Sequence, residues 1–279
     1  MLKVLKSGFF TTIQDTGRFG FRDKGVPVSG IMDTETVYKL NMLLENERDA
    51  AVLEITMTGP TLEFEEATYI ALGGAELSIT LNNEPVSNYK VLKVNAGDIL
   101  SYGRLKKGFR AYLAIKKGFQ SSLVLGSRSY YGNITPKALL KDKYEVPYIH
   151  TALFEPKITG LKVDSILDEE ILHVAKGPEF ELLDDKQLEM LFSQEFTIAN
   201  ENNRMAYQLN ETITGHAVSM LTSATLPGTI QFTPAGKLII LMKDGQTTGG
   251  YPRILQLTDK GISILAQKKA GDTLSFKLM

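Results

Sequence analysis

Most of the chain is a series of short apolar runs that alternate with polar residues and stop at Gly, Pro or Asn. Alternation with a period of two indicates a half-buried β-strand. Residues 69–86 predict two strands joined at Asn82 and Asn83, because asparagine tolerates the positive φ of a tight turn. Residues 110–116 and 237–243 predict further strands. The pattern therefore predicts a protein that is mainly β.

Helical signals are fewer and lie in three segments. Asp33 precedes an apolar stripe over residues 34–44, and its carboxylate can cap a helix there. Residues 184–192 and 261–267 have a similar helical spacing of apolar positions. A few helices should therefore accompany the strands.

Four segments of the N-terminal half resemble four segments of the C-terminal half, in the same order. The pairs begin at Leu2 and Leu172, at Arg18 and Arg204, at Leu53 and Leu221, and at Ala96 and Ala270. Such a collinear series predicts a duplication into two related β-barrel halves, each with an Ala-Gly-Asp turn before a closing strand. The alternative is that β-proteins reuse Gly-Asp turns without any common origin.

The connection between the halves should lie at residues 142–165, which contain two prolines and no clear period. We therefore expect a first half over residues 1–150, with residues 104–140 as an excursion that completes or decorates it. The second half should span residues 166–279. A chain of 279 residues can bury one large core or two of ordinary domain size.

The composition excludes several classes of chemistry. There is no cysteine, so disulfides, thiolate catalysis, iron–sulfur clusters and cysteine-ligated zinc are ruled out. The three histidines, His150, His173 and His216, lack the paired spacing of metal ligands. A net charge of −1 argues against non-specific binding of nucleic acid, although a local anion site remains open.

The N-terminal residues reach an acidic side chain without a long apolar stretch, which argues against a signal peptide. No window approaches the roughly 20 apolar residues of a membrane-spanning helix. We therefore expect a cytoplasmic protein that does not engage a membrane.

The segment over residues 11–33 is the first candidate for chemistry. It holds four glycines, which permit positive φ and close approach of the backbone to a ligand. Arg18 offers a planar fork for a carboxylate or phosphate, and Asp15 could orient it or handle a proton. The alternative is a glycine-rich loop with one ordinary ion pair.

The second candidate, residues 243–253, directly follows an apolar strand, where binding loops often lie. Gly249 and Gly250 could hold an oxyanion with backbone N–H groups. Thr247 and Thr248 supply hydroxyls, and Tyr251 adds a ring with a polar tip. A tight hairpin would need only the two glycines, so both interpretations stay open.

A third segment places Arg128 between two serines, where it could bind an anionic group or cap a strand end. Several familiar motifs are absent. The nearest approach to a phosphate-binding P-loop, at Gly103–Gly108, is followed by Phe109, and no G-x-G-x-x-G or G-x-S-x-G motif occurs. Three scattered histidines also argue against a Ser-His-Asp triad. An enzyme of this sequence would have to use Arg, Asp, Thr, Tyr and backbone amides.

These segments resemble a known family. TTIQDTGRFGFRDKGVPVSGIMD is similar to its N-terminal signature, and NMLLEN, AVLEITMTGP, GFRAYLAIKKGF, LGSRS, PGTIQF, DGQTTGGYPRI and LAQKKAGDTLSF follow in the family's order. It is the biotin-dependent carboxyltransferase-like family. Its members include the C subunit of 5-oxoprolinase, Kip antagonist A and the second subdomain of the urea carboxylase carboxyltransferase, also called allophanate hydrolase subunit 2. The similarity extends over nearly the whole chain.

The resemblance implies cyclophilin-like β-barrel architecture and a hydrolase that opens 5-oxoproline to glutamate with ATP. It implies B-type (Kip inhibitor-like) and A-type partner subunits and a small lactam or amide substrate. ATP binding, the nucleotide-binding function, is expected at the level of the complex, with a site that is not on this chain alone. Biotin is expected in the carboxyltransferase relatives. No metal ligand is evident. The expected catalytic residues are Asp15, Arg18, Arg128 and Arg204. The expected substrate-binding residues are Gln14, Gly17, Asp33, Gln231, Gln246, Thr247, Thr248, Gly249, Gly250 and Tyr251.

The sequence departs from the family pattern mainly in its C-terminal half. Asn203, Ala224, Gly245 and Gly261 stand where the family usually places charged residues, and Glu45 replaces a glycine. Loss of several charges from one candidate pocket is the pattern expected of a changed substrate or of lost catalysis.

Three functions therefore stay open. The first is an enzyme subunit, either of 5-oxoprolinase or of a related amide carboxyltransferase or hydrolase. The second is a non-catalytic partner that binds and antagonises a B-type protein, and the third is a stand-alone binder of a small carboxylate.

Overall fold

The computed structural model describes all 279 residues and divides the chain into two compact units. Unit 1 comprises Met1–Arg18 and Ser29–Ser165, and unit 2 comprises Phe19–Val28 and Ile166–Met279. Residues 19–28, called the arm below, lie early in the chain but belong to unit 2. The domain limits expected from the sequence did not separate the arm from the N-terminal half.

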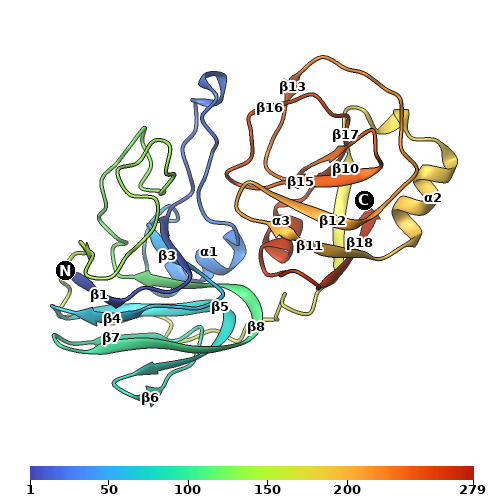
Figure 1. Cartoon of the computed structure of the whole chain (residues 1–279). Coiled ribbons are helices and arrows are strands. Elements are labelled where there is room, and N and C mark those ends of the chain that lie inside the picture. The colour runs from blue at the N-terminus through green and yellow to red at the C-terminus, as the bar shows by residue number, and fades with distance from the viewer. The chain divides into compact units, whose positions relative to one another are not determined.

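Unit 1 is built on a nine-stranded sheet with the order β2-β3-β8-β4-β1-β9 (Figure 1). The long strand β8 (Ile99–Ile115) organises it, because its start pairs with β4 (Thr61–Phe64) and its end with β3 (Val52–Thr56). The strand β5 (Thr68–Leu81) runs along β8 and also pairs with the two short strands beside it. The remaining strands are β1 (Leu2–Lys6), β2 (Phe10–Gln14), β6 (Glu84–Pro85), β7 (Val91–Val94) and β9 (Glu145–Val146).

Alternating apolar residues on these strands form the main core of unit 1. Leu53 pairs with Leu113 and Leu62 with Leu100, and all four side chains are buried. Burial of each such leucine stabilises the fold by about 1.5–3 kcal/mol. Where β5 and β8 are irregular, Gly74 adopts a φ of +82°, and a Cβ there would lie 2.4 Å from the carbonyl oxygen of Arg110.

The helix α1 (Thr34–Leu43) packs on β5 and β8 and makes a second core. Val37 and Leu40 of the helix are buried with Ala71 and Ala114 of the strands. Asp33 begins the helix, because its carboxylate accepts from the backbone N–H of Thr36 at 3.0 Å. The predicted cap at Asp33 is confirmed.

Unit 2 contains a closed barrel of seven strands with the order β10-β17-β14-β15-β12-β11-β18. β10 and β18 pair in parallel, and the other neighbours are antiparallel. Its interior is filled from most strands, for example by Leu172, Phe196, Ile230 and Ile240. The strands are β10 (Ile171–Lys176), β11 (Phe196–Asn202), β12 (Ala206–Thr212), β14 (Thr229–Phe232), β15 (Lys237–Leu241), β17 (Arg253–Leu257) and β18 (Thr273–Leu278).

Smaller elements complete unit 2. A two-stranded sheet pairs β13 (Ser223–Ala224) with β16 (Thr248–Gly249). The helices are α2 (Asp185–Ser193) and α3 (Asp259–Ala266), with the 3-10 turns η1 (Arg22–Lys24) and η2 (Phe180–Leu182). The three predicted helices and the mainly β class are thus confirmed, with helix limits shifted by one or two residues.

The two units differ in closure, although the sequence predicted a barrel in each half. Unit 2 is closed, but the sheet of unit 1 ends at β2 and at the two-residue strand β9. The strand order also does not repeat, because β4 pairs with β1 whereas its counterpart β14 pairs with β15 and β17.

The Ala-Gly-Asp turns are the part of the predicted repeat that has the same geometry in both units. Gly97 and Gly271 have φ values of +86° and +88°. Asp98 accepts from the N–H three residues earlier at 2.7 Å, and Asp272 does so at 2.9 Å. Both turns lead directly into a strand, as predicted.

Candidate functional site

Asp15 follows strand β2 and is the hydrogen-bonding centre of a loop over residues 124–129 in unit 1. Its carboxylate accepts from the hydroxyls of Ser127 and Ser129 at 2.6 and 2.7 Å and from the N–H of Arg128 at 2.5 Å. It also accepts from the N–H of Gly17 at 2.8 Å. Since only 7% of Asp15 is exposed, its geometry fits a positioning residue better than a free proton acceptor.

Arg18 binds the same loop. Its guanidinium donates to the carbonyl oxygens of Ser129 at 2.5 Å and of Val124 at 3.4 Å, and the residue is 1% exposed. Gln14 is buried and its amide oxygen accepts from the N–H of Gly30 at 3.1 Å. Gln14, Asp15, Gly17 and Arg18 therefore act together to hold the ends of the arm and the 124–129 loop.

Asp33, predicted to bind substrate, is fully buried and caps α1. Its N–H donates to the Tyr112 hydroxyl at 2.9 Å, and that hydroxyl donates to Glu54 at 3.0 Å. Burial and the neighbouring carboxylates raise the pKa of Tyr112. This network binds the helix to the sheet and leaves Asp33 no exposed surface for a ligand.

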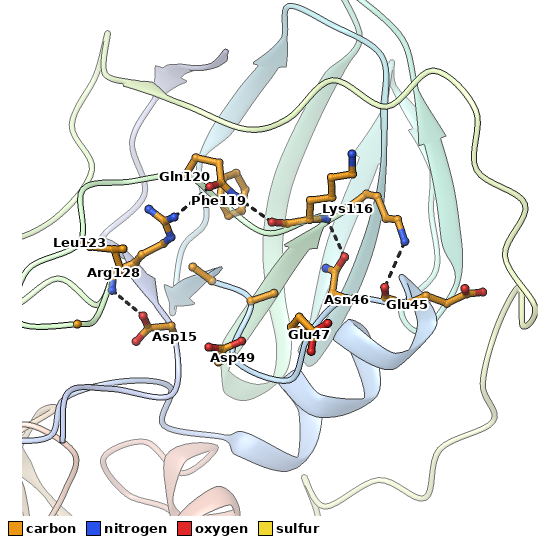
Figure 2. Close-up of a pocket in the computed structure, with 14 residues that line it drawn as sticks. Asp15, Glu45, Asn46, Glu47, Asp49, Lys116, Phe119, Gln120, Leu123 and Arg128 are labelled. Carbon is orange, nitrogen blue, oxygen red and sulfur yellow. Dashed lines mark hydrogen bonds between the residues drawn. The ribbon is translucent and has the colours of Figure 1, made fainter.

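Arg128 lines a cavity of about 630 Å³ in unit 1. Its guanidinium donates to the carbonyl oxygen of Ser121 and, at 3.0 Å, to the side-chain oxygen of Gln120. Figure 2 shows Arg128 beside Gln120 and Leu123 on one side of the cavity, and Lys116 and Glu45 on the other. Among the predicted residues, Asp15 and Arg128 meet at this cavity.

The second group of predicted residues lies in unit 2, on the loop between β15 and β17. Exposure alternates along it, since Gln246, Thr248 and Gly250 are exposed whereas Thr247 and Gly249 are buried. Tyr251 is 41% exposed. The exposed residues can meet a ligand directly, while the buried ones shape the loop.

Gln231 of β14 lies beneath this loop and is 1% exposed. Its amide oxygen accepts from Gln246 at 3.4 Å, while its amide nitrogen has no hydrogen-bond acceptor. A Cβ at Gly249 would lie 2.2 Å from that nitrogen, so glycine is required here by close packing against the two glutamines.

The arm contributes Arg22 to the same loop, a residue that lies in the N-terminal signature but was not among the predicted site residues. Its guanidinium donates to the carbonyl oxygens of Thr225 and Thr247. Burial lowers the pKa of Arg22 from its ordinary value. The glycines around Arg22 stand out in the sequence, but nothing local indicates that the arm belongs to the other unit.

Arg204, predicted to be catalytic, forms a two-pronged ion pair with Asp244. Its Nε and Nη2 lie 2.9 and 3.2 Å from the carboxylate oxygens, and Arg204 is buried. The pair fixes the start of the 244–251 loop, because the N–H of Asp244 also donates to the Arg204 carbonyl at 2.8 Å. Its geometry is that of a positioning residue.

The departures from the family pattern have different structural consequences. Asn203 accepts from the N–H groups of Met205 and Ala206 with its side-chain oxygen, as an aspartate could. Gly245 is tightly enclosed, since a Cβ would lie 2.8 Å from the Met242 carbonyl oxygen. Ala224 is exposed, and Gly261 lies in the first turn of α3. Asn203 therefore preserves a turn and Ala224 alters the loop surface, while Gly245 and Gly261 are buried.

No group of three or more His, Cys, Asp or Glu side chains is arranged to hold a metal ion. None of the helices combines the length and apolar character needed to cross a bilayer.

The family model for "Carboxyltransferase domain, subdomain A and B" matches residues 24–278, so the chain belongs to that family. It is homologous to the C subunit of 5-oxoprolinase from Escherichia coli (strain K12), with 32% identity over 99% of this chain and 90% of the relative. Urea amidolyase of Lachancea kluyveri is 29% identical over 98% of this chain but only 17% of that protein. The crystal structure of the K. lactis urea amidolyase superposes with a TM-score of 0.89 at 28% identity, covering 100% of this chain and 18% of that one.

Proposed function

We propose that this chain is the C subunit of an ATP-dependent 5-oxoprolinase, which acts with A-type and B-type subunits to open 5-oxoproline to glutamate. The observation that carries the proposal is the share of each relative's length that this chain spans. The chain spans 90% of the E. coli 5-oxoprolinase relative but less than a fifth of the urea amidolyases. The similar length of this chain and the 5-oxoprolinase subunit favours 5-oxoprolinase activity over that of urea amidolyase.

Opening a lactam places negative charge on the carbonyl oxygen, so donors fixed before the reaction would lower the barrier. In unit 2 we assign this role to the exposed loop residues Gln246, Thr248 and Gly250, with Tyr251 beside them. Arg204, Gln231 and Arg22 position the loop through Asp244, Gln246 and Thr247. In unit 1, Asp15 and Arg18 position the loop that carries Arg128.

We place the ATP site on another subunit. The residues of this chain do not fit a nucleotide well, because there is no glycine-rich phosphate loop and no cluster of carboxylates to hold a magnesium ion. We assign biotin to the carboxyltransferase relatives and not to the 5-oxoprolinase reaction of this chain. The cyclophilin-like architecture implied by the resemblance is proposed for the closed barrel of unit 2, and a common origin of the two halves is proposed from their matching turns.

Reconstitution tests the proposal. The chain mixed with A-type and B-type subunits, ATP and 5-oxoproline should release glutamate and ADP together. Thr248→Val with Gln246→Ala should lower the turnover by about 10²-fold, the order expected for loss of a transition-state donor. Asp23→Asn, an exposed change on the arm, should leave it unchanged. Absence of both products in every combination of subunits would rule the proposal out.

A second function, a non-catalytic partner that binds and antagonises a B-type protein, is favoured by the loss of charge at Ala224 and Gly245. This function predicts that the chain binds a B-type protein on its own and relieves inhibition by it. Under this alternative, neither the wild-type chain nor the variant with both Gln246→Ala and Thr248→Val would support detectable turnover. The double change would also not weaken the complex with the B-type protein.

A further inference from the structure

The cavity of unit 1 shares no residue with the loop of unit 2 to which the proposed function assigns the transition-state donors. It is lined by the turn after α1, by residues 116–120 and by the 124–129 loop. Ala50, Ala51, Phe119 and Leu123 are the apolar residues of its lining. Its volume of about 630 Å³ lies within the range of about 300–1,000 Å³ that small-molecule sites occupy.

Hydrogen bonds make the cavity walls rigid. Asn46 joins two of them, donating to the carbonyl oxygen of Ile115 at 2.8 Å and accepting from the N–H of Lys117 at 2.7 Å. Glu45 and Lys117, on the two segments that Asn46 joins, have left-handed φ values of 47° and 66°. Such strain costs on the order of 1–3 kcal/mol and tends to persist at ligand sites.

Several charged groups of the lining already have partners. The four donors described above occupy the Asp15 carboxylate. Glu45 accepts from the N–H of Lys157 at 3.0 Å. Lys116 donates to the carbonyl oxygen of Leu44 at 2.6 Å and lies over the Phe154 ring.

The other charged groups have no ion-pair partner in the chain. Glu47 and Asp49 lie on the loop that follows α1 and form neither an ion pair nor a side-chain hydrogen bond (Figure 2). Lys117 is exposed. Arg128 uses two of its five N–H donors. One of them binds the Gln120 side chain, which is itself fixed because its amide nitrogen donates to the carbonyls of Lys117 and Gly118, so the guanidinium plane of Arg128 is held in place. The lining thus carries two cationic groups, Arg128 and Lys117, and two anionic groups, Glu47 and Asp49, that have no ion-pair partner.

We propose that this cavity binds a small zwitterion of the amino-acid type. Its carboxylate would meet Arg128 and Lys117, and its ammonium group would meet Glu47 and Asp49. A simple anion would satisfy the cations but lie close to two unpaired carboxylates, so the ammonium group is what the site selects. The cavity is larger than one amino acid requires, so a dipeptide with the same two charged ends also fits.

Calorimetric titration of the isolated full-length chain tests this with four probes: L-glutamate, L-alanyl-L-glutamate, glutarate and 5-oxo-L-proline. The last two lack an ammonium group. Binding of L-glutamate or of the dipeptide at least tenfold more tightly than glutarate is expected, and the comparison of those two identifies the free amino acid or the peptide as the better ligand. Because no partner subunit or ATP is present, the result is independent of the proposed turnover.

Variants at the two walls should separate the charges. Glu47→Gln combined with Asp49→Asn should weaken binding of the zwitterion by about tenfold or more, the effect of losing one charge-assisted hydrogen bond. The same change should strengthen binding of glutarate, because it removes the repulsion of the two carboxylates. Lys117→Gln and Arg128→Lys should weaken every probe that binds. Glu84→Gln, exposed on β6, is the matched control. The proposal is overturned if neither zwitterion binds at millimolar concentration, or if both carboxylate changes leave zwitterion binding at the wild-type level.

Discussion

Asp15 and Arg18 stabilise the same part of unit 1 although they were selected as catalytic candidates. Both are buried and both hold the 124–129 loop, so a change at either residue should first be interpreted as a change in loop structure. The useful experimental question is whether a variant lowers the unfolding free energy or only the activity.

Asp15→Ala should lower the unfolding free energy of the chain by about 1.5–3 kcal/mol. Removing the carboxylate leaves the hydroxyls of Ser127 and Ser129 and the N–H of Arg128 without their acceptor in a buried site. Urea denaturation followed by circular dichroism measures the loss. Glu84→Ala, at an exposed position of the same unit, should change it little, and an equally small effect at Asp15 would contradict this role.

Glu179 should make the stability of unit 2 depend on pH. The hydrogen bond from Arg253 holds the pKa of this carboxyl below its ordinary value of 4.5. The stabilisation is therefore complete above pH 4.5 and is lost as the pH falls through the lowered pKa. Glu179→Gln should make the unfolding free energy less dependent on pH as the pH falls below 4.5. Glu181→Gln, at an exposed neighbouring site, should keep the wild-type slope.

At the scale of elements, the arm is the feature with the largest consequence for the site. The chain leaves unit 1 after Arg18 and returns to it at Ser29. The segments on either side of the arm are joined by a hydrogen bond from the N–H of Ile31 to the Asp15 carbonyl at 2.9 Å. Gly30 lies between them with a φ of +87°, and a Cβ there would lie 2.8 Å from the backbone of Gly17. The closure therefore depends on glycine.

Gly30→Ala should destabilise the chain by about 2 kcal/mol or more, since backbone strain and steric overlap add. Gly20→Ala is the matched control, because its φ of +83° is equally unfavourable but no atom lies within 4 Å of the added Cβ. Its cost should be only the strain of about 1 kcal/mol. Equal shifts of the midpoint in thermal unfolding for the two variants would show that the arm closure is not tightly packed.

The sequence predicted those elements whose signal is local. The Asn82–Asn83 turn, the cap at Asp33, the three helices and both Ala-Gly-Asp turns are each specified by a few adjacent residues. The closed barrel of unit 2 was also predicted, from the repeat. What the sequence missed depends on distant pairing, because the open sheet of unit 1 and the place of Arg22 follow from contacts between residues far apart in the chain.

The same limit applies to the candidate site. Residue type and motif selected Arg128 and the 246–251 loop, which the structure leaves accessible in part. They could not distinguish these from Asp33 and Gln14, whose burial depends on partners more than ten residues away. Glu47 and Asp49 lie in none of the motifs, and Lys117, although within GFRAYLAIKKGF, was not among the predicted site residues. A cavity wall has no sequence signature of its own.

At the scale of the molecule, a single cut between the units would leave the arm, which belongs to unit 2, covalently attached to unit 1. The exposed segment after Gly160 has few backbone hydrogen bonds, and Lys162 within it is exposed. Limited trypsin digestion should therefore cleave first after Lys162. The fragment 1–162 would then carry the arm, which is part of unit 2.

The two tryptic fragments should accordingly stay together under native conditions and co-elute in size-exclusion chromatography, although a denaturing gel separates them. Arg22→Ala removes the guanidinium that donates to Thr225 and Thr247 and should weaken the association of the fragments by about tenfold. Asp23→Ala, one residue further along the arm, forms no such bond and should leave it unchanged. If the wild-type fragments instead eluted separately under native conditions, the contacts between the arm and the rest of unit 2 would be too weak to hold the fragments together.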